Sequence, residues 1–258
     1  MMTNALRLAG RYYSIPLVLL VWQAAVTSGL VESRLLPSLG RVLSVLARDI
    51  GDGVLPYHTA VTLGRAGVGF AFAAVVGVPF AAAMARSTLV RNLFEPIFFF
   101  GYPVPKIALF PIFTYIFGIG SPSKIAFAFL ECLYPIVVTA YLGFRAIPLP
   151  LIWTAENMGA RRTSLLTRVI LPAALPSIFT GLRIALPISI IVIVLTEMIG
   201  DSRGLGYYIS VSGTRFEFAN VYAAILVIGA CGFVLDRAML ALRHAALHWE
   251  RGEIGADM

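Results

Sequence analysis

Long apolar runs dominate the sequence, and most of them are long enough to cross a membrane as a helix. A transmembrane helix needs about 20 mostly apolar residues to span the hydrocarbon core. Six stretches of about this length predict an all-α polytopic membrane protein, with a single transmembrane domain over residues 1–258. The predicted spans are 14–30, 58–85, 93–117, 125–144, 178–199 and 221–242.

Two stretches between these spans are amphipathic. In 36–53, leucines and valines recur at helical spacing, while Arg41, Arg48 and Asp49 fall on the other face, a pattern typical of a helix in the membrane interface. A second amphipathic stretch, 202–218, precedes the last span. Residues 145–177 form the longest interval between spans and predict the one sizeable feature on the cytoplasmic side.

The composition supports a membrane protein. Hydrophobic residues make up 59% of the chain and charged residues only 13%, against roughly 25% in soluble domains. The formal net charge of +7 could indicate nucleic acid, but arginine-rich cytoplasmic loops produce the same excess, so we expect no nucleic-acid partner. Cys132 and Cys231 fall inside apolar runs and predict buried small hydrophobes.

The arginines predict how the spans are oriented, because cytoplasmic loops carry an excess of basic residues. The N-terminal segment resembles a secretory signal, but five more spans follow, so we interpret it as an uncleaved first span. With the N-terminus inside, the outer segments balance arginine against carboxylates, and six spans return the C-terminus to the cytoplasm. The cytoplasmic arginines would be Arg7, Arg11, Arg86, Arg91, Arg145, Arg161, Arg162, Arg168, Arg243 and Arg251.

Small residues form a ladder in the second span. Gly69, Ala73, Gly77, Ala81 and Ala85 are spaced four apart, so they share one helix face. Such a stripe lets two helix backbones approach closely in a membrane, and it predicts a packing surface.

The third span contains Pro96, Pro103, Pro105 and Pro111, and it should be a kinked helix because each proline removes a backbone donor. Lys106 lies in the middle of this span. A charge at that depth costs about 2.5–3.5 kcal/mol on insertion scales. Two interpretations remain open: Lys106 lines a translocation path, or it snorkels or pairs with a carboxylate such as Glu131.

Other charges also fall within spans, among them Arg65, Arg183 and Glu197. If the fifth helix runs on from Pro172, Arg183 lies about 16 Å along it. Arg183 could receive a small anion or clamp helices together through carbonyl hydrogen bonds. Lys106, Glu131, Arg183 and Glu197 are therefore the candidate residues of a translocation path.

Several kinds of site are missing from the sequence. The only lysines are Lys106 and Lys124, and neither ends a GxxxxGK[ST] phosphate loop, so this chain cannot bind ATP in that way. His244 and His248 have the spacing of a zinc pair, but no third ligand is evident. We expect no metal, no cofactor and no catalytic residues.

The interval 145–177 predicts a helix, a glycine turn and a second helix at the cytoplasmic surface. The segment 151–159 can form a short helix with Leu151, Ile152, Ala155 and Met158 on one side, and Gly159 supplies the turn. The segment ARRTSLLTRVI follows, and Pro172 suits the first turn of the next span. A docking surface for a soluble partner has this form.

The same interval resembles the cytoplasmic loop of permease subunits of bacterial ATP-binding-cassette (ABC) importers, which is patterned EAA, three residues, G, nine residues, I-x-LP. Here Gly159 is followed ten positions later by Val169, and then by Leu171 and Pro172. Tryptophan replaces the glutamate of the EAA motif. The positions that resemble the coupling loop are Trp153, Thr154, Ala155, Glu156, Gly159, Ala160, Arg161, Leu171 and Pro172.

The resemblance extends over most of the chain. The stretches LPSLGRVLSVL, HTAVTLGRAGVGF, PVPKIALFPIFTYIFGIGSPSKI, LPAALPSIFTGLRIAL and EMIGDSRGLGYYI look like those of the nitrate/sulfonate/taurine permeases. The family implies a type I importer fold in the inner membrane, a second permease copy, two cassette ATPases and a periplasmic or lipid-anchored substrate-binding protein. It also implies a small, anionic solute. A stand-alone secondary transporter or channel is the alternative, although carriers of this size often show internal repeats and none is evident here.

Overall fold

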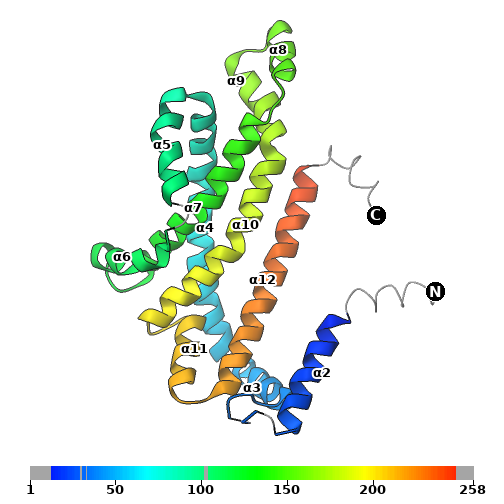
Figure 1. Cartoon of the computed structure of the whole chain (residues 1–258), viewed down its shortest axis with the longest axis vertical. Coiled ribbons are helices and arrows are strands. Elements are labelled where there is room, and N and C mark those ends of the chain that lie inside the picture. The colour runs from blue at the N-terminus through cyan, green and yellow to red at the C-terminus, as the bar shows by residue number, and fades with distance from the viewer. Residues whose placement is uncertain (1–12, 30, 33, 102–103, 248–258) are drawn as a thin grey trace, which may run out of the picture.

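In a computed structural model, residues 13–29, 31–32, 34–101 and 104–247 are described, and within these ranges the chain is helical, with no β-strand (Figure 1). Arg7, Arg11, Pro103, His248 and Arg251 lie outside them. The elements are α2 (Ser14–Thr27), α3 (Leu39–Gly51), α4 (Val54–Arg86), α5 (Thr88–Gly101), the 3₁₀ helix η1 (Lys106–Leu109), α6 (Phe110–Phe117), α7 (Ser121–Arg145), α8 (Leu149–Asn157), α9 (Arg162–Leu165), the π-helical turn η2 (Leu166–Ile170), α10 (Leu171–Ile199), α11 (Leu205–Thr214) and α12 (Phe218–Ala246).

The centre of the molecule is a bundle of α4, α7 and α10, with α12 along one side (Figure 1). Four continuous helical segments among the described residues are long and apolar enough to cross a membrane: Val54–Arg86, Ser121–Arg145, Arg162–Ile199 and Phe218–Ala246. They contain the predicted spans 58–85, 125–144, 178–199 and 221–242. Two shorter apolar helices, Pro16–Thr27 and Lys106–Phe117, lie within the other two predicted spans.

The third predicted span, 93–117, is not one kinked helix. The structure divides it into α5, η1 and α6, so the chain leaves the α-helical conformation between Gly101 and Lys106. Proline explains where the breaks fall. Pro105 directly precedes η1, and Pro111 lies in the first turn of α6, where a missing N–H is tolerated. Pro96 stays inside α5.

The small-residue ladder of α4 packs against α7, as predicted. Gly69, Ala73, Gly77 and Ala81 are buried, while Ala85 at the helix end is half-buried. A Cβ atom at Gly69 would lie 2.9 Å from the Cβ of Ala128 on α7, so a larger residue could not be accommodated without separating the helices. The ladder therefore sets how closely α4 and α7 approach.

The two amphipathic stretches form α3 and α11, which lie at the same end of the molecule (Figure 1). Ser38 caps α3 by accepting a hydrogen bond from Arg41 N. The α2 helix stands away from the central bundle and is attached near α3. There Trp22 Nε1 donates to Pro37 O at 3.0 Å, and its ring packs against Tyr222 of α12.

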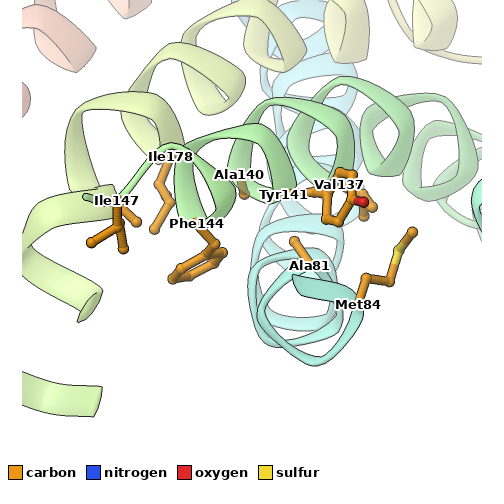
Figure 2. Close-up of a cluster of buried hydrophobic side chains, with 9 residues drawn as sticks. Ala81, Met84, Val137, Ala140, Tyr141, Phe144, Ile147 and Ile178 are labelled. Carbon is orange, nitrogen blue, oxygen red and sulfur yellow. The ribbon is translucent and has the colours of Figure 1, made fainter. Parts of the chain in front are cut away.

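A hydrophobic cluster joins α4, α7 and α10 at the opposite end (Figure 2). Met84 comes from α4, Tyr141 and Phe144 from α7, and Ile178 from α10. Ile147 extends the cluster into the connection between α7 and α8. The chain that enters α8 is thus anchored in the core of the bundle.

Candidate functional site: the α8 loop and the charges between helices

Gly159 closes α8 in the way the sequence predicts. Its φ of +80° is left-handed, which glycine adopts without steric cost. Gly159 N donates to Glu156 O at 2.9 Å and Ala160 N donates to Ala155 O at 3.0 Å. This pair of bonds is the Schellman motif, which satisfies the last carbonyls of a helix. The turn after α8 is therefore defined by backbone geometry.

The second helix of the loop does not stop before the next span. From Arg162 the chain runs through α9 and η2 directly into α10, as one helical segment to Ile199. As predicted, Pro172 lies in the first turn of α10, and a π-helical turn at Leu166–Ile170 precedes it. Since a proline displaces the carbonyl four residues earlier, the wider turn before Pro172 makes room for its ring. A force on α9 can therefore pass into α10 along one helical segment, and α8 is joined to that segment by the turn at Gly159.

The side chains of α8 divide into a supported and an exposed face. Ile152 packs against the cluster of Figure 2, and Ala155 is half-buried. Leu151 and Met158, which the sequence placed on the same side as Ile152 and Ala155, are 45% and 83% exposed. Trp153, at the glutamate position of the EAA motif, is 56% exposed. A short helix with large exposed apolar residues is a surface suited to a protein partner.

A pocket of about 330 Å³ separates α8 and α9 from the ends of α4 and α7. Its lining includes Arg86 of α4, Phe144 of α7 and Glu156 of α8. The loop is therefore held at its base by Ile147 and Ile152 but is not packed solidly against the bundle.

At the other end of the bundle, four buried charges form one network. Arg65 of α4 lies 2.8 Å from Glu197 of α10 and 2.7 Å from Asp201 in the loop after α10. Lys124 of α7 lies 3.1 Å from the same Asp201 carboxylate. Two cations and two carboxylates balance, which is the condition under which charges can be buried.

Glu197 has both carboxylate oxygens occupied. Oε2 accepts from Thr62 Oγ1 at 2.8 Å and from Gly206 N at 3.1 Å, and Oε1 accepts from Arg65. Gly204 and Gly206 allow the start of α11 to pass close to this carboxylate. A Cβ atom at Gly204 would lie 2.1 Å from the Glu197 carboxyl carbon. The sequence EMIGDSRGLGYYI thus ties α4, α10 and α11 together.

Asp201 lies between the helices, in the loop that follows α10. Burial alone would raise the pKa of Asp201, but the Ser202 N–H and the Lys124 and Arg65 cations together hold that pKa below its usual value. The carboxylate is therefore ionised at neutral pH and serves as the shared anion of the network.

The structure brings Lys106 and Glu131 together, as one of the two sequence interpretations expected. Lys106 Nζ lies 3.6 Å from Glu131 Oε2 of α7 and 4.6 Å from the centroid of the Tyr134 ring. The two charged side chains are 15% and 16% exposed. Tyr134 Oη donates to Ile97 O of α5 at 2.9 Å, so this cluster sits where α5 ends and η1 begins. Ionisable groups beside a broken membrane helix are a common arrangement at transport sites.

Arg183 has a partner that sequence reasoning missed. Asp236 of α12 accepts from Arg183 Nε at 2.7 Å and from Nη2 at 3.2 Å. Asp236 lies in the sixth predicted span, and a carboxylate within an apolar run was the sequence signal that could have identified it as a partner. Lys124 and Asp201 were also missed, because they lie at the edges of predicted spans and far apart in the sequence. Among the described residues no group of His, Cys, Asp and Glu could hold a metal ion.

An all-helical membrane bundle whose helix–Gly–helix loop continues into α10 is the architecture of an ABC importer permease. Residues 73–246 match the family described as the inner membrane component of binding-protein-dependent transport systems, and the chain belongs to this family. It is an inner-membrane permease subunit that works with ATPase and substrate-binding proteins, and ATP hydrolysis belongs to the separate ATPase.

Among relatives, the taurine transport system permease protein TauC of Escherichia coli (strain K12) is 34% identical over 93% of this chain and 89% of its own length. The putative aliphatic sulfonates transport permease protein SsuC of Bacillus subtilis (strain 168) is 27% identical over 92% and 86%. The bicarbonate transport system permease protein CmpB of Synechococcus elongatus (strain ATCC 33912 / PCC 7942 / FACHB-805) is 30% identical over 72% and 67%.

The solved structures give the same fold. A chain from the inward-facing MetNI methionine ABC transporter superposes with a TM-score of 0.64 at 20% identity, over 72% of this chain and 93% of that one. The structure is therefore a type I importer permease fold.

Proposed function

We propose that α8 and the turn at Gly159 form the surface to which the ATPase subunit docks. The observation that carries this proposal is the exposed α8 helix, closed by a Schellman turn and joined through one continuous helical segment to α10. Such a helix can transmit a push from the ATPase into the membrane. The residues assigned to coupling are Trp153, Thr154, Ala155, Glu156, Gly159, Ala160, Arg161, Leu171 and Pro172.

Two substitutions at Gly159 test this assignment. Valine is strained at a φ of +80°, whereas asparagine tolerates this conformation. We expect Gly159→Val to lose most ATPase co-purification and transport while still inserting in the membrane, and Gly159→Asn to keep both. If the valine variant binds the ATPase and transports at the wild-type rate, the docking proposal fails.

We further propose that both chain termini face the cytoplasm and that two permease copies assemble with two ATPases. Four arginines lie where α4, α7 and α12 end and where α9 begins: Arg86, Arg145, Arg243 and Arg162. Figure 1 places these helix ends toward one end of the molecule. The positive-inside rule assigns that end to the cytoplasm. A reporter fused at the C-terminus should be active only as a cytoplasmic reporter; activity of a periplasmic reporter would reverse the orientation.

The transported solute is, in our proposal, a small organic or inorganic anion of the sulfonate, taurine or nitrate class. The relatives named for taurine, aliphatic sulfonates and bicarbonate support this class. The discriminating experiment is a ligand screen of the substrate-binding protein that co-purifies with the transporter. If it binds only neutral or cationic solutes, the proposed class is wrong.

Within the permease, we assign the translocation path to the Lys106–Glu131 pair. These side chains lie beside the helix break, whereas Glu197 is fully enclosed and the Arg183–Asp236 pair joins two unbroken helices, α10 and α12. We therefore infer that Glu197 and Arg183 hold helices together. Lys106→Gln should reduce anion uptake at least several-fold with ATPase binding intact, and uptake at the wild-type level would contradict the assignment.

A further inference from the structure

The end of the molecule that carries α3 and α11 contains a basic pocket that neither coupling nor translocation uses. Its volume is about 550 Å³, and it lies between α3 and the connection from α11 to α12. Three arginines line it: Arg34, Arg41 and Arg48. Glu217 is the one carboxylate among its lining residues, so the lining has a net positive charge.

The charge of this pocket is only partly compensated. Arg48 pairs with Asp49 at 2.7 Å, and the Asp49 carboxylate also accepts from Tyr208. Within the part of the chain that the structure describes, neither Arg34 nor Arg41 has an ion-pair partner. Guanidinium groups gathered around one pocket repel one another, and an oxyanion placed between them would relieve the repulsion.

The helix that supplies two of these arginines has the form of a helix in a membrane interface. The buried face of α3 carries Val42, Val45 and Asp49, so the predicted placement of Asp49 on the polar face is wrong. Arg41 and Arg48 lie to one side of this buried face. To the other side lie Leu43 and Ile50, which are 57% and 50% exposed. A helix with an apolar exposed side and a basic exposed side sits between acyl chains and head groups.

Phe216, at the rim of the pocket, adds a second observation. It is the one non-glycine residue with positive φ among the described residues, at +59°. Phe216 occupies the Schellman position after α11, since its N–H bonds Gly213 O and Glu217 N bonds Ser212 O. Glycine is the residue that this position favours, yet a phenylalanine that is 73% exposed is held there. A strained exposed aromatic beside a basic pocket indicates a surface built for contact rather than for stability.

We propose that this pocket binds the phosphate head group of an anionic phospholipid, with Arg34 and Arg41 as its main ligands. Arginine forks match phosphate oxygens bidentately, and basic residues of interfacial helices attract anionic lipid head groups. Leu43, Ile50 and Phe216 are the exposed apolar groups available to the acyl chains. The bound lipid would fasten α3 and the start of α12 to the membrane surface.

The test compares lipids on the purified full chain, together with the subunits that co-purify with it, in delipidating detergent. Phosphatidylglycerol should raise the unfolding temperature by several degrees more than phosphatidylcholine. Arg41→Gln should remove at least half of that difference. Arg203→Gln, which removes a charge at the same end but outside the pocket, should leave it unchanged. Native mass spectrometry should show fewer retained phosphatidylglycerol molecules on Arg41→Gln.

Phe216→Gly separates ligand binding from folding. Relief of the left-handed strain should maintain or raise the unfolding temperature without lipid, while the increment from phosphatidylglycerol falls.

Equal effects of both lipids, or equal losses in Arg41→Gln and Arg203→Gln, would overturn the proposal. So would a phosphate-only effect, in which millimolar inorganic phosphate reproduces the full shift. If Arg41→Gln keeps the lipid effect but loses stimulation by the substrate-binding protein, the pocket docks that protein instead. ATPase docking is at the opposite end, so its failure would not affect these results.

Discussion

At the scale of single residues, the buried network around Glu197 depends on glycines as much as on charges. Gly204 combines a φ of +107° with a Cβ direction that points into the Glu197 carboxylate. A side chain there would be strained and would also separate α11 from α10. The sequence Gly-Leu-Gly at 204–206 is therefore required because the chain packs closely around a charged group. This role is visible only in the assembled structure of α4, α10 and α11.

Gly204→Ala should lower stability by about 2–4 kcal/mol, because backbone strain adds to the loss of a buried hydrogen-bonded contact. Gly213→Ala inside α11, the helix that follows Gly204, is the control, since its Cβ would meet nothing within 4 Å and alanine favours helix. Thermal unfolding in detergent measures both. If the two variants unfold at the same temperature, the packing argument for Gly204 is wrong.

The lowered pKa of Asp201 predicts how this network responds to acid. Because its folded pKa is below that of an unfolded aspartate, about 3.9, its contribution to stability is complete above that value and is lost as pH falls through the folded pKa. Asp201→Asn should therefore unfold at a lower temperature than wild type from about pH 7 to about pH 5, and the gap should narrow below about pH 4. A gap that widens on acidification would contradict the assignment.

At the scale of helices, α4 and α7 are matched through the small-residue face of α4. Gly69→Leu should separate these helices and sharply reduce the amount of folded protein, because its Cβ already meets Ala128 and the carbonyl of Ile125. Gly67→Leu in the same helix is the control, because its Cβ has open space. Size-exclusion profiles of fluorescent fusions report both; equal monodisperse peaks would show that the face is not a packing surface.

At the scale of the whole molecule, patterns local in sequence predicted more than partnerships between distant residues. The Gly159 turn and the ladder from Gly69 to Ala81 could be predicted because each is set by one helix and its own spacing. The breaks around Pro105 and Pro111 were predicted only as kinks, because the sequence shows which donors are missing but not how neighbours support the chain. The Lys124–Asp201 and Arg183–Asp236 pairs depend on how helices are rotated against one another, which no local pattern specifies.

The Arg183–Asp236 pair tests how α12 is held to α10. Each side chain is partly exposed, at 44% and 36%, and a membrane around it makes an unpaired charge costly. We expect Arg183→Met to reduce folded protein strongly, because Asp236 loses its partner. The double variant Arg183→Met/Asp236→Leu should recover much of the loss, since it leaves no charge unpaired. Yields of folded protein at equal expression measure this coupling. If the yield of the double variant is as low as that of the single variant, the ion pair itself joins α10 to α12. If the yield recovers, the two side chains mainly need to neutralise each other's charge.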